Sequence, residues 1–298
     1  MVALIKIIFC VVSLSFVIFF GLIPQALSVD TEISFENKKV SFEISLAGET
    51  QLIRGYLSKR MEGEGPYPAV ILLHGCTGLD LDGYALPWKG LADHARFLNK
   101  NNFISLIIDS HGSRGITTRA SWVDSCVYGK GYLERTADVD GAIKFLEKLK
   151  YVDRSKIILL GQSQGAMVVL NALRSDGGSQ IRTVAAGIAY YPHCKYLTDM
   201  LAMQRFKNYF YSPILIIMGS QDNITPVRYC RKLIEVMNNN PNSSEIIPVL
   251  LEYKGAQHSF DLPLWFSSDT PIGTVASDRK ATTDSRERYL VFIRKLFN

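Results

Sequence analysis

The residues of this chain that are best placed to do chemistry surround Ser163, at the centre of a G-Q-S-Q-G pentapeptide. Four apolar residues precede the pentapeptide, and an apolar run typical of a buried helix follows it. A strand, a tight turn and a helix in this order hold a serine in a strained backbone conformation at the tip of the turn. Glycine at Gly161 and Gly165 leaves room for the backbone that a side chain would contact there. The pattern predicts that Ser163 is a nucleophile at the end of a sheet.

A serine nucleophile needs a base that takes its proton, and the base needs a carboxylate that orients it. In hydrolases with this turn the three residues follow in the chain order Ser, Asp or Glu, His. His258 fits because it follows the last predicted strand, and Asp222 fits because it follows an earlier one. His193 is a less suitable candidate for the base, because no strand-end carboxylate lies between it and Ser163 in the chain. Asp261 is the alternative acid, which its position after the histidine disfavours.

Two backbone amides must stabilise the oxyanion that forms when the nucleophile attacks. The expected donors are Gln164, the residue after the nucleophile, and Cys76, in the H-G-C-T-G loop at 74–78. We expect His74 to be a hydrogen-bonding scaffold for this loop. A nucleophilic role for Cys76 is disfavoured, since it lies outside the strand-turn-helix pattern and has no assigned base.

The elements that must position these residues alternate along the chain after an initial hairpin at 32–57. Strands are predicted at 69–73, 104–108, 157–160, 184–191, 214–218 and 246–253, and helices at 88–101, 134–150, 166–173, 227–237 and 279–297. Regular alternation without a linker or a repeat indicates one mostly parallel, doubly wound sheet. In such sheets the functional loops follow the carboxyl ends of the strands, where every motif named above lies.

The composition limits the classes of function. The chain has 298 residues, of which 47% are hydrophobic, so it can bury a large core. The net charge of +5 is modest, and the lysines and arginines are scattered. No basic patch typical of nucleic-acid binding is present, so we expect no nucleic-acid partner. No cluster of ligand residues appears either, so we expect neither a metal nor an organic cofactor.

Residues 1–28 have the pattern of a secretory signal peptide. A positive charge lies near the start, an apolar run fills 7–23, and small residues at Ala26 and Ser28 fit a cleavage site. An uncleaved anchor is the alternative, because about 17 apolar residues can just span a membrane. In either case we expect a single domain at 29–298, exported to the periplasm or the medium, which meets a membrane only if the segment stays uncleaved.

Four cysteines follow this segment, at Cys76, Cys126, Cys194 and Cys230. An even number in an exported protein permits two disulfides, with three connectivities. Buried free thiols are the alternative.

Several motifs together resemble the dienelactone hydrolase family of the α/β-hydrolase superfamily. They are HGCTG at 74–78, DSHGSRG at 109–115, GQSQGA at 161–166, YYPHC at 190–194, GSQDNITPVRYC at 219–230 and YKGAQHSFD at 253–261. The resemblance implies an α/β-hydrolase fold, with an eight-stranded, mostly parallel sheet, helices on both faces and an antiparallel second strand. The family's namesake has a cysteine at the position of Ser163 and a glutamate at Gly75. We therefore expect a serine carboxylic-ester hydrolase rather than an enzyme for dienelactone itself.

The same resemblance implies two disulfides, because the fold brings the loops that carry these cysteines together in pairs. The implied bonds are Cys76–Cys126 and Cys194–Cys230. Arg114 is expected to fix its glycine-rich loop by bonding carbonyls or a carboxylate, and contact with an anionic substrate is the alternative.

Only the segment 115–144 could cap the site, so we expect an open, small pocket. Within it, Trp122, Tyr128 and Tyr132 either line the pocket or pack as an ordinary aromatic cluster.

The sequence thus predicts an exported serine hydrolase that cleaves a small-molecule carboxylic ester or lactone through an acyl-enzyme. One alternative is acyl transfer or peptide hydrolysis, because the same triad serves both. Another is a catalytically silent ligand-binding protein on the same fold. The sequence sets neither the acyl length nor the oligomeric state.

Overall fold

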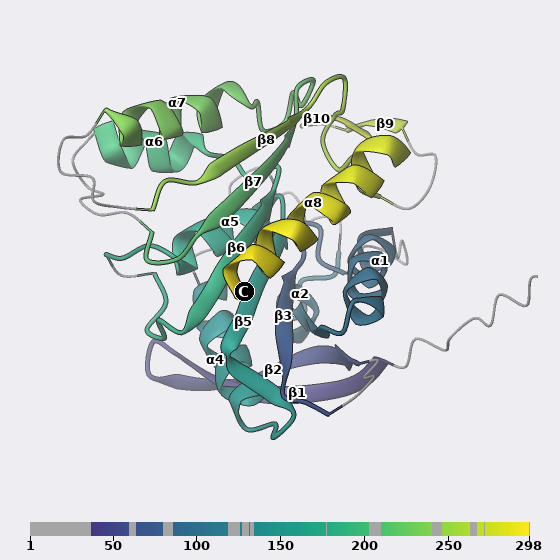
Figure 1. Ribbon diagram of the computed structural model, residues 1–298, viewed down its shortest axis with the longest axis vertical. Helices are drawn as coiled ribbons and strands as arrows, with labels where there is room; N and C mark the ends of the chain where they lie inside the picture. The colour runs from purple at the N-terminus through teal and green to yellow at the C-terminus, as the bar shows by residue number, and fades with distance from the viewer. Residues whose placement is uncertain are drawn as a thin grey trace, which may run out of the picture. The chain divides into compact units, whose positions relative to one another are not determined.

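An eight-stranded sheet with the order β1-β2-β4-β3-β5-β6-β7-β8 organises the computed structural model (Figure 1). The strands are β1 (Asn37–Leu46), β2 (Glu49–Ser58), β3 (Tyr67–Leu73), β4 (Ile104–Asp109), β5 (Val152–Gln162), β6 (Val184–Tyr190), β7 (Ile214–Gly219) and β8 (Val249–Tyr253). β2 pairs antiparallel with both β1 and β4, and all the other pairs are parallel. The predicted hairpin, the eight strands and the antiparallel second strand are therefore confirmed.

The structure describes most of the chain. The described residues are 37–59, 64–79, 86–118, 126, 131, 134–176, 178–202, 210–239, 246–262, 267–270 and 272–297. Residues Phe35–Asn298 form one compact unit. The predicted signal segment at 1–28 and the aromatic residues Trp122, Tyr128 and Tyr132 lie outside the described residues. Among the helices that are described, none is long and apolar enough to cross a membrane.

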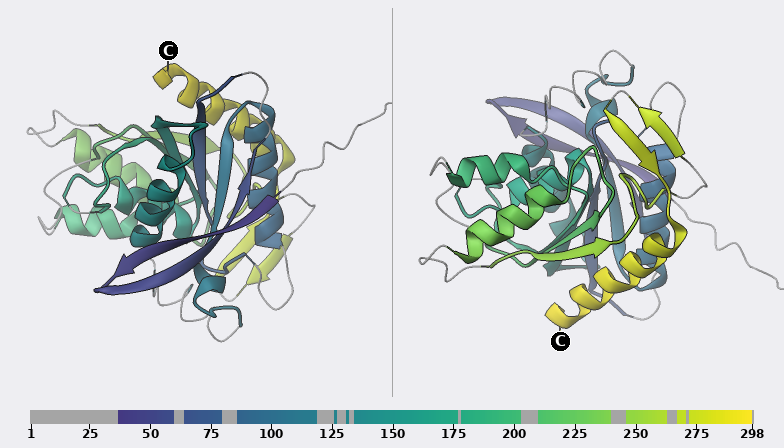
Figure 2. Two further views of the ribbon diagram at one scale, coloured as in Figure 1. Left: turned by 90° about the horizontal axis from the view of Figure 1, so that it is seen from below. Right: turned by 90° about the horizontal axis from the view of Figure 1, so that it is seen from above.

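Seven described helices flank the sheet. They are α1 (Leu86–Lys100), α2 (Ser110–Ser113), α4 (Arg135–Glu147), α5 (Gln164–Ala172), α6 (Lys195–Ala202), α7 (Arg228–Asn238) and α8 (Arg279–Phe297). α1 and α8 lie on one face and meet through the rings of Phe97 and Tyr289, whereas α4, α5, α6 and α7 lie on the other face (Figure 2). Both faces of the sheet are covered, as the alternation of elements predicts.

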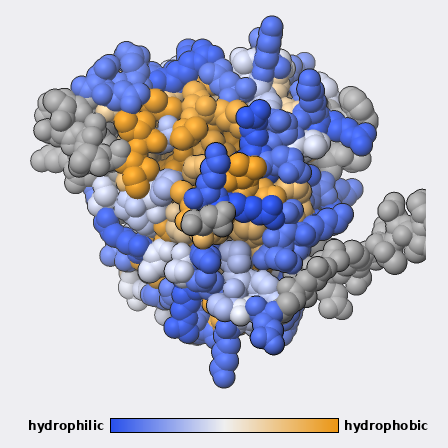
Figure 3. Space-filling model, in the orientation of Figure 1, coloured by the Kyte–Doolittle hydropathy of each residue, from blue (hydrophilic) through white to orange (hydrophobic). Residues whose placement is uncertain are grey.

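The core lies between these helices and the central strands. Val70–Leu73 in β3 and Ile157–Leu160 in β5 are fully buried. A strand that is covered on both faces reads as a continuous apolar run, which is why these strands were recognisable in the sequence. Apolar side chains also reach the surface over β7, β8 and α8 (Figure 3), where Val249 and Val291 are the most exposed large ones.

A second, two-stranded sheet was not predicted. β9 (Ser267–Thr270) pairs antiparallel with β10 (Gly273–Ala276). β10 also bridges to His258 through Val275, and the amide of Thr274 donates to Oδ1 of Asn223 at 2.9 Å. This hairpin therefore braces two of the loops that carry predicted site residues.

Candidate active site

The turn between β5 and α5 holds Ser163 in the strained conformation that the pentapeptide predicts. Its φ of 52° and ψ of −117° lie in a region that side chains other than glycine rarely adopt. The Ser163 carbonyl accepts from the amides of Ala166 and Met167, so the helix begins at once after the turn. This geometry directs the hydroxyl off the carboxyl end of the central strand.

The two flanking glycines leave no room for a side chain. A Cβ at Gly161 would lie 2.2 Å from the Gly165 carbonyl oxygen, and one at Gly165 would lie 2.3 Å from that of Leu73. Both contacts are with backbone, which cannot move aside cheaply. The close approach of β3, β5 and α5 around Ser163 thus requires glycine at both places.

The structure brings Ser163, Asp222 and His258 together. Nε2 of His258 lies 3.1 Å from Oγ of Ser163, and Nδ1 lies 2.8 Å from Oδ2 of Asp222. Asp222 follows β7 and His258 follows β8, so three strand ends supply the three side chains. The base is within hydrogen-bond distance of the nucleophile, and the acid is within hydrogen-bond distance of the base.

Donors from the adjacent turn fix the Asp222 carboxylate. Its Oδ1 accepts from the amides of Ile224 and Thr225, and its Oδ2 accepts from the Thr225 hydroxyl at 2.8 Å. The ring of Tyr191 packs against the ring of His258 with centroids 4.5 Å apart. Acid and base are thus both held in place by their neighbours before a substrate arrives.

The loop at 74–78 lies directly beside the nucleophile. A Cβ at Gly75 would be 3.5 Å from Cβ of Ser163. Cys76 is the next residue of this loop, and Gln164 is the first residue of α5. The two segments that carry the predicted oxyanion donors therefore lie beside Ser163.

Arg135 links these two flanking segments and was missed in the sequence. Its Nη1 donates to Oε1 of Gln164 at 3.0 Å, and its Nη2 donates to the carbonyl of His74 at 2.8 Å. The side chain is buried at the start of α4. Burial lowers the pKa of Arg135 to about 10, so the guanidinium stays charged at neutral pH. An arginine in the first turn of a helix, where the dipole disfavours a cation, was the available signal.

Two neutral histidines support the same loop. The rings of His74 and His111 lie 4.6 Å apart, and both side chains are buried. Burial, with help from Arg135 and Arg114, lowers the pKa of His111 to about 3. Burial likewise lowers the pKa of His74 well below its usual value. His74 thus has the surroundings of the scaffold that we expected.

Arg114 fixes its own loop, as predicted. Its guanidinium bonds both oxygens of Asp138, at 2.9 and 2.7 Å, and also the carbonyl of Ser110. The alternative of contact with an anionic substrate is not needed to explain this side chain.

Both disulfides that the resemblance implies are present. Cys76 is bonded to Cys126, and Cys194 is bonded to Cys230. The alternative of free thiols is therefore wrong, and so is the alternative of Cys76 as a nucleophile. The first of these bonds anchors the loop that flanks Ser163.

The alternative acid, Asp261, has other partners. Its carboxylate accepts from His94, Gln162 and Tyr191 instead of orienting His258. Its place in the chain is close to the base, but its side chain points into the core. The remaining histidine, His193, packs its ring near that of Tyr229.

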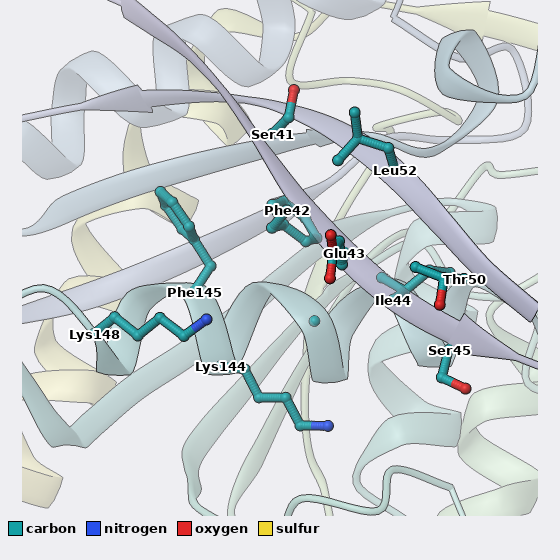
Figure 4. A pocket seen from close by; sticks show the side chains of 11 residues that line it. Ser41, Phe42, Glu43, Ile44, Ser45, Thr50, Leu52, Lys144, Phe145 and Lys148 are labelled. Carbon is teal, nitrogen blue, oxygen red and sulfur yellow. The ribbon is translucent and has the colours of Figure 1, made fainter.

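A groove lies elsewhere, between the β1-β2 hairpin and α4 (Figure 4). It has a volume of about 570 Å³, an apolar floor that includes Phe42 and Phe145, and a rim that carries Glu43, Lys144 and Lys148. None of the residues around Ser163 lines it.

The sequence model of the dienelactone hydrolase family matches residues 53–297. No curated protein matches the chain.

Among solved structures, a dienelactone hydrolase-like promiscuous phosphotriesterase from metagenomic libraries is 19% identical with a TM-score of 0.66, over 87% of this chain and 98% of that one. The esterase domain of a Rhodothermus marinus protein is 14% identical with a TM-score of 0.55, over 87% and 98%. A puromycin-hydrolyzing peptidase of Mycobacterium tuberculosis is 14% identical with a TM-score of 0.59, over 88% of this chain but only 39% of that one. At these identities the likeness establishes a shared fold.

Proposed function

Because the chain belongs to the dienelactone hydrolase family and is a serine hydrolase, we propose that it cleaves carboxylic esters or lactones of small molecules. The observation that carries the proposal is the chain of contacts from Ser163 through His258 to Asp222. The same geometry supports the roles of these three residues.

In the first step Oγ of Ser163 attacks the ester carbonyl while Nε2 of His258 takes the hydroxyl proton. Asp222 keeps the imidazole in the tautomer that leaves Nε2 free to accept, and it stabilises the imidazolium that forms. His258 then returns the proton to the departing alcohol. The products of this half of the reaction are the free alcohol and an acyl-enzyme on Ser163.

Negative charge develops on the carbonyl oxygen during the attack. The backbone amides of Gln164 and Cys76 are the proposed donors to this oxygen, and the first is supported by the N-terminus of α5. Water activated by His258 then attacks the acyl-enzyme, releases the acid and restores Ser163. For a lactone, acid and alcohol leave as one hydroxy acid.

The disulfides and the N-terminal segment bear on where the protein is located. Two disulfides suggest a compartment outside the reducing cytoplasm. We propose in addition that residues 1–28 direct export and are removed. The mass of the protein's N-terminal peptide after expression in a secreting host tests this, and a chain that still begins at Met1 contradicts it.

The proposed substrate class is tested with p-nitrophenyl esters from acetate to decanoate. We expect turnover by the wild-type protein, an optimum at one acyl length, and loss of turnover in Ser163→Ala. Equal rates in both proteins would remove Ser163 from the mechanism. Turnover of peptide amides but of no ester would favour the peptidase alternative, and binding without turnover would favour a silent protein.

A further inference from the structure

Asp261 is a buried carboxylate that does not belong to the triad of Ser163, Asp222 and His258. Its side chain has no exposed surface, and neither has that of His94. Oδ2 accepts from Nε2 of His94 at 2.7 Å and from Nε2 of Gln162 at 2.6 Å, and Oδ1 accepts from the Tyr191 hydroxyl at 2.5 Å. A buried carboxylate is stable only when such donors replace the water that it loses.

Two of the three donors, Gln162 and Tyr191, come from segments that converge on the active site. Gln162 is the last residue of β5 and immediately precedes Ser163. Tyr191 follows β6 and packs its ring against that of His258 in a tilted contact, with centroids 4.5 Å apart. Asp261 itself lies three residues after His258. One carboxylate thus connects the segment of the nucleophile to the segment of the base.

The protonation states agree with this arrangement. Burial alone would raise the pKa of Asp261, but the donors from His94, Tyr191 and Gln162 outweigh it, and the pKa lies below its usual value. Burial lowers the pKa of His94, so its ring is neutral and donates through Nε2. The cluster therefore holds one negative charge at neutral pH.

The loop between His258 and Asp261 needs such an anchor. Ser259 has a φ of 57°, in the left-handed region that costs a side chain of this type free energy. On its other side the loop is held by the bond from the Ala276 amide to the His258 carbonyl. The Phe260 carbonyl in the middle of the loop accepts from the Asp278 amide and the Thr282 hydroxyl, and Asp261 fixes the end of the loop.

We propose that Asp261 is a positioning residue, which holds the loop of His258 and the segment of Ser163 at the separation that proton transfer requires. The inference rests on the proposed function. It assigns to Asp261 no contact with the substrate, so its effect is on kcat and not on KM. Since a displacement of about 1 Å can cost about 100-fold in rate, loosening the anchor should be visible in turnover.

Two adjacent tyrosines provide a matched test. Tyr191→Phe removes the hydroxyl that bonds Asp261, and Tyr190→Phe removes a hydroxyl that bonds Ser285 instead, at 2.9 Å. Both side chains are buried in the same region. We expect a similar loss of thermal stability from the two variants. We also expect kcat to fall roughly 10- to 100-fold in Tyr191→Phe alone, with KM unchanged in both.

A second variant keeps the shape of the carboxylate. Asp261→Asn removes the charge and places a side-chain amide N–H where the carboxylate accepts hydrogen bonds, so that it faces other donors. The fall in kcat should therefore be larger than in Tyr191→Phe, again without a change in KM. Equal kcat in Tyr191→Phe and Tyr190→Phe would overturn the inference, as would a rise in KM as large as the fall in kcat.

A failure of the substrate proposal can be told apart from a failure of the positioning role of Asp261. If the wild-type protein cleaves no ester of the series, the same three variants are compared by the rate at which a fluorophosphonate labels Ser163. Slower labelling in Tyr191→Phe and Asp261→Asn than in Tyr190→Phe supports the positioning role without any ester. Equal labelling, or no labelling of the wild-type protein, overturns it.

Discussion

The two disulfides allow the role of the oxyanion loop to be separated from stability. Cys76–Cys126 closes a loop with a sequence separation of 50 residues, and Cys194–Cys230 closes one of 36. The entropy that a cross-link removes from the unfolded chain depends only on the logarithm of this length. Each bond therefore stabilises the folded protein by about 4 kcal/mol.

The catalytic effects of the two bonds should differ. Cys76 carries one of the proposed oxyanion amides, and Gly75 before it lies beside Ser163. Cys194 and Cys230 instead join the loop after β6 to α7. Removal of one oxyanion donor costs about 100- to 1,000-fold in kcat, so displacement of the loop by the loss of its anchor should cost about 10- to 100-fold.

The assay uses the paired variants Cys76→Ala/Cys126→Ala and Cys194→Ala/Cys230→Ala. Unfolding in denaturant should give similar losses of stability for the two. Ester hydrolysis, measured at roughly 10–20 °C where folded proteins are near their maximum stability, should show the fall in kcat for the first pair only. Full kcat in the first pair, or equal losses of kcat in both, would contradict a role of the Cys76–Cys126 bond in holding the oxyanion loop.

Two further predictions concern Arg135 and His111. Arg135→Lys keeps the charge but cannot bond both Gln164 and His74, so kcat should fall about tenfold, the equivalent of one charge-assisted hydrogen bond, with KM unchanged. Arg114→Lys is the control, because it weakens an ion pair with Asp138 that includes neither Gln164 nor His74, and equal losses of kcat would contradict the prediction. The pKa of His111 is lowered to about 3 mainly by burial, so the unfolded chain, with a pKa of about 6.5, binds a proton first as the pH falls. The free energy of unfolding should thus drop by about 2 kcal/mol between about pH 7 and pH 5 from this residue alone. This part of the drop should be absent in His111→Gln. If the pH dependence of the unfolding free energy, measured by chemical denaturation, is the same in this variant as in the wild-type protein, the prediction is refuted.

Local patterns account for what the sequence could predict. Ile157–Leu160 is recognisable as a strand because both faces of the sheet are covered, and Gly161 and Gly165 are explained by backbone contacts that only glycine permits. The chain order of Ser163, Asp222 and His258 pointed to residues that the structure brings within hydrogen-bond distance. The two disulfides followed from the family resemblance, since spacing alone left three connectivities open.

The missed features depend on contacts between distant parts of the chain. Arg135 meets His74 across 61 residues, and Gln162 meets Asp261 across 99. A pattern in sequence cannot tell which way the Asp261 carboxylate points, so Asp261 stayed an alternative acid although its position after His258 disfavoured it. In the structure the carboxylate accepts from other side chains, Gln162 and Tyr191 among them. The β9-β10 hairpin was missed because its short strands, S-S-D-T and G-T-V-A, lack a clear alternation of apolar and polar residues.

The central claim is that Ser163 is a nucleophile activated by His258 and Asp222. The most direct measurement is treatment of the purified protein with a fluorophosphonate, followed by digestion and mass spectrometry of the labelled peptide. We expect one adduct, on Ser163, that forms much more slowly in Asp222→Asn and is absent in Ser163→Ala. An adduct on another residue, or an unlabelled Ser163 in a folded protein, would contradict it.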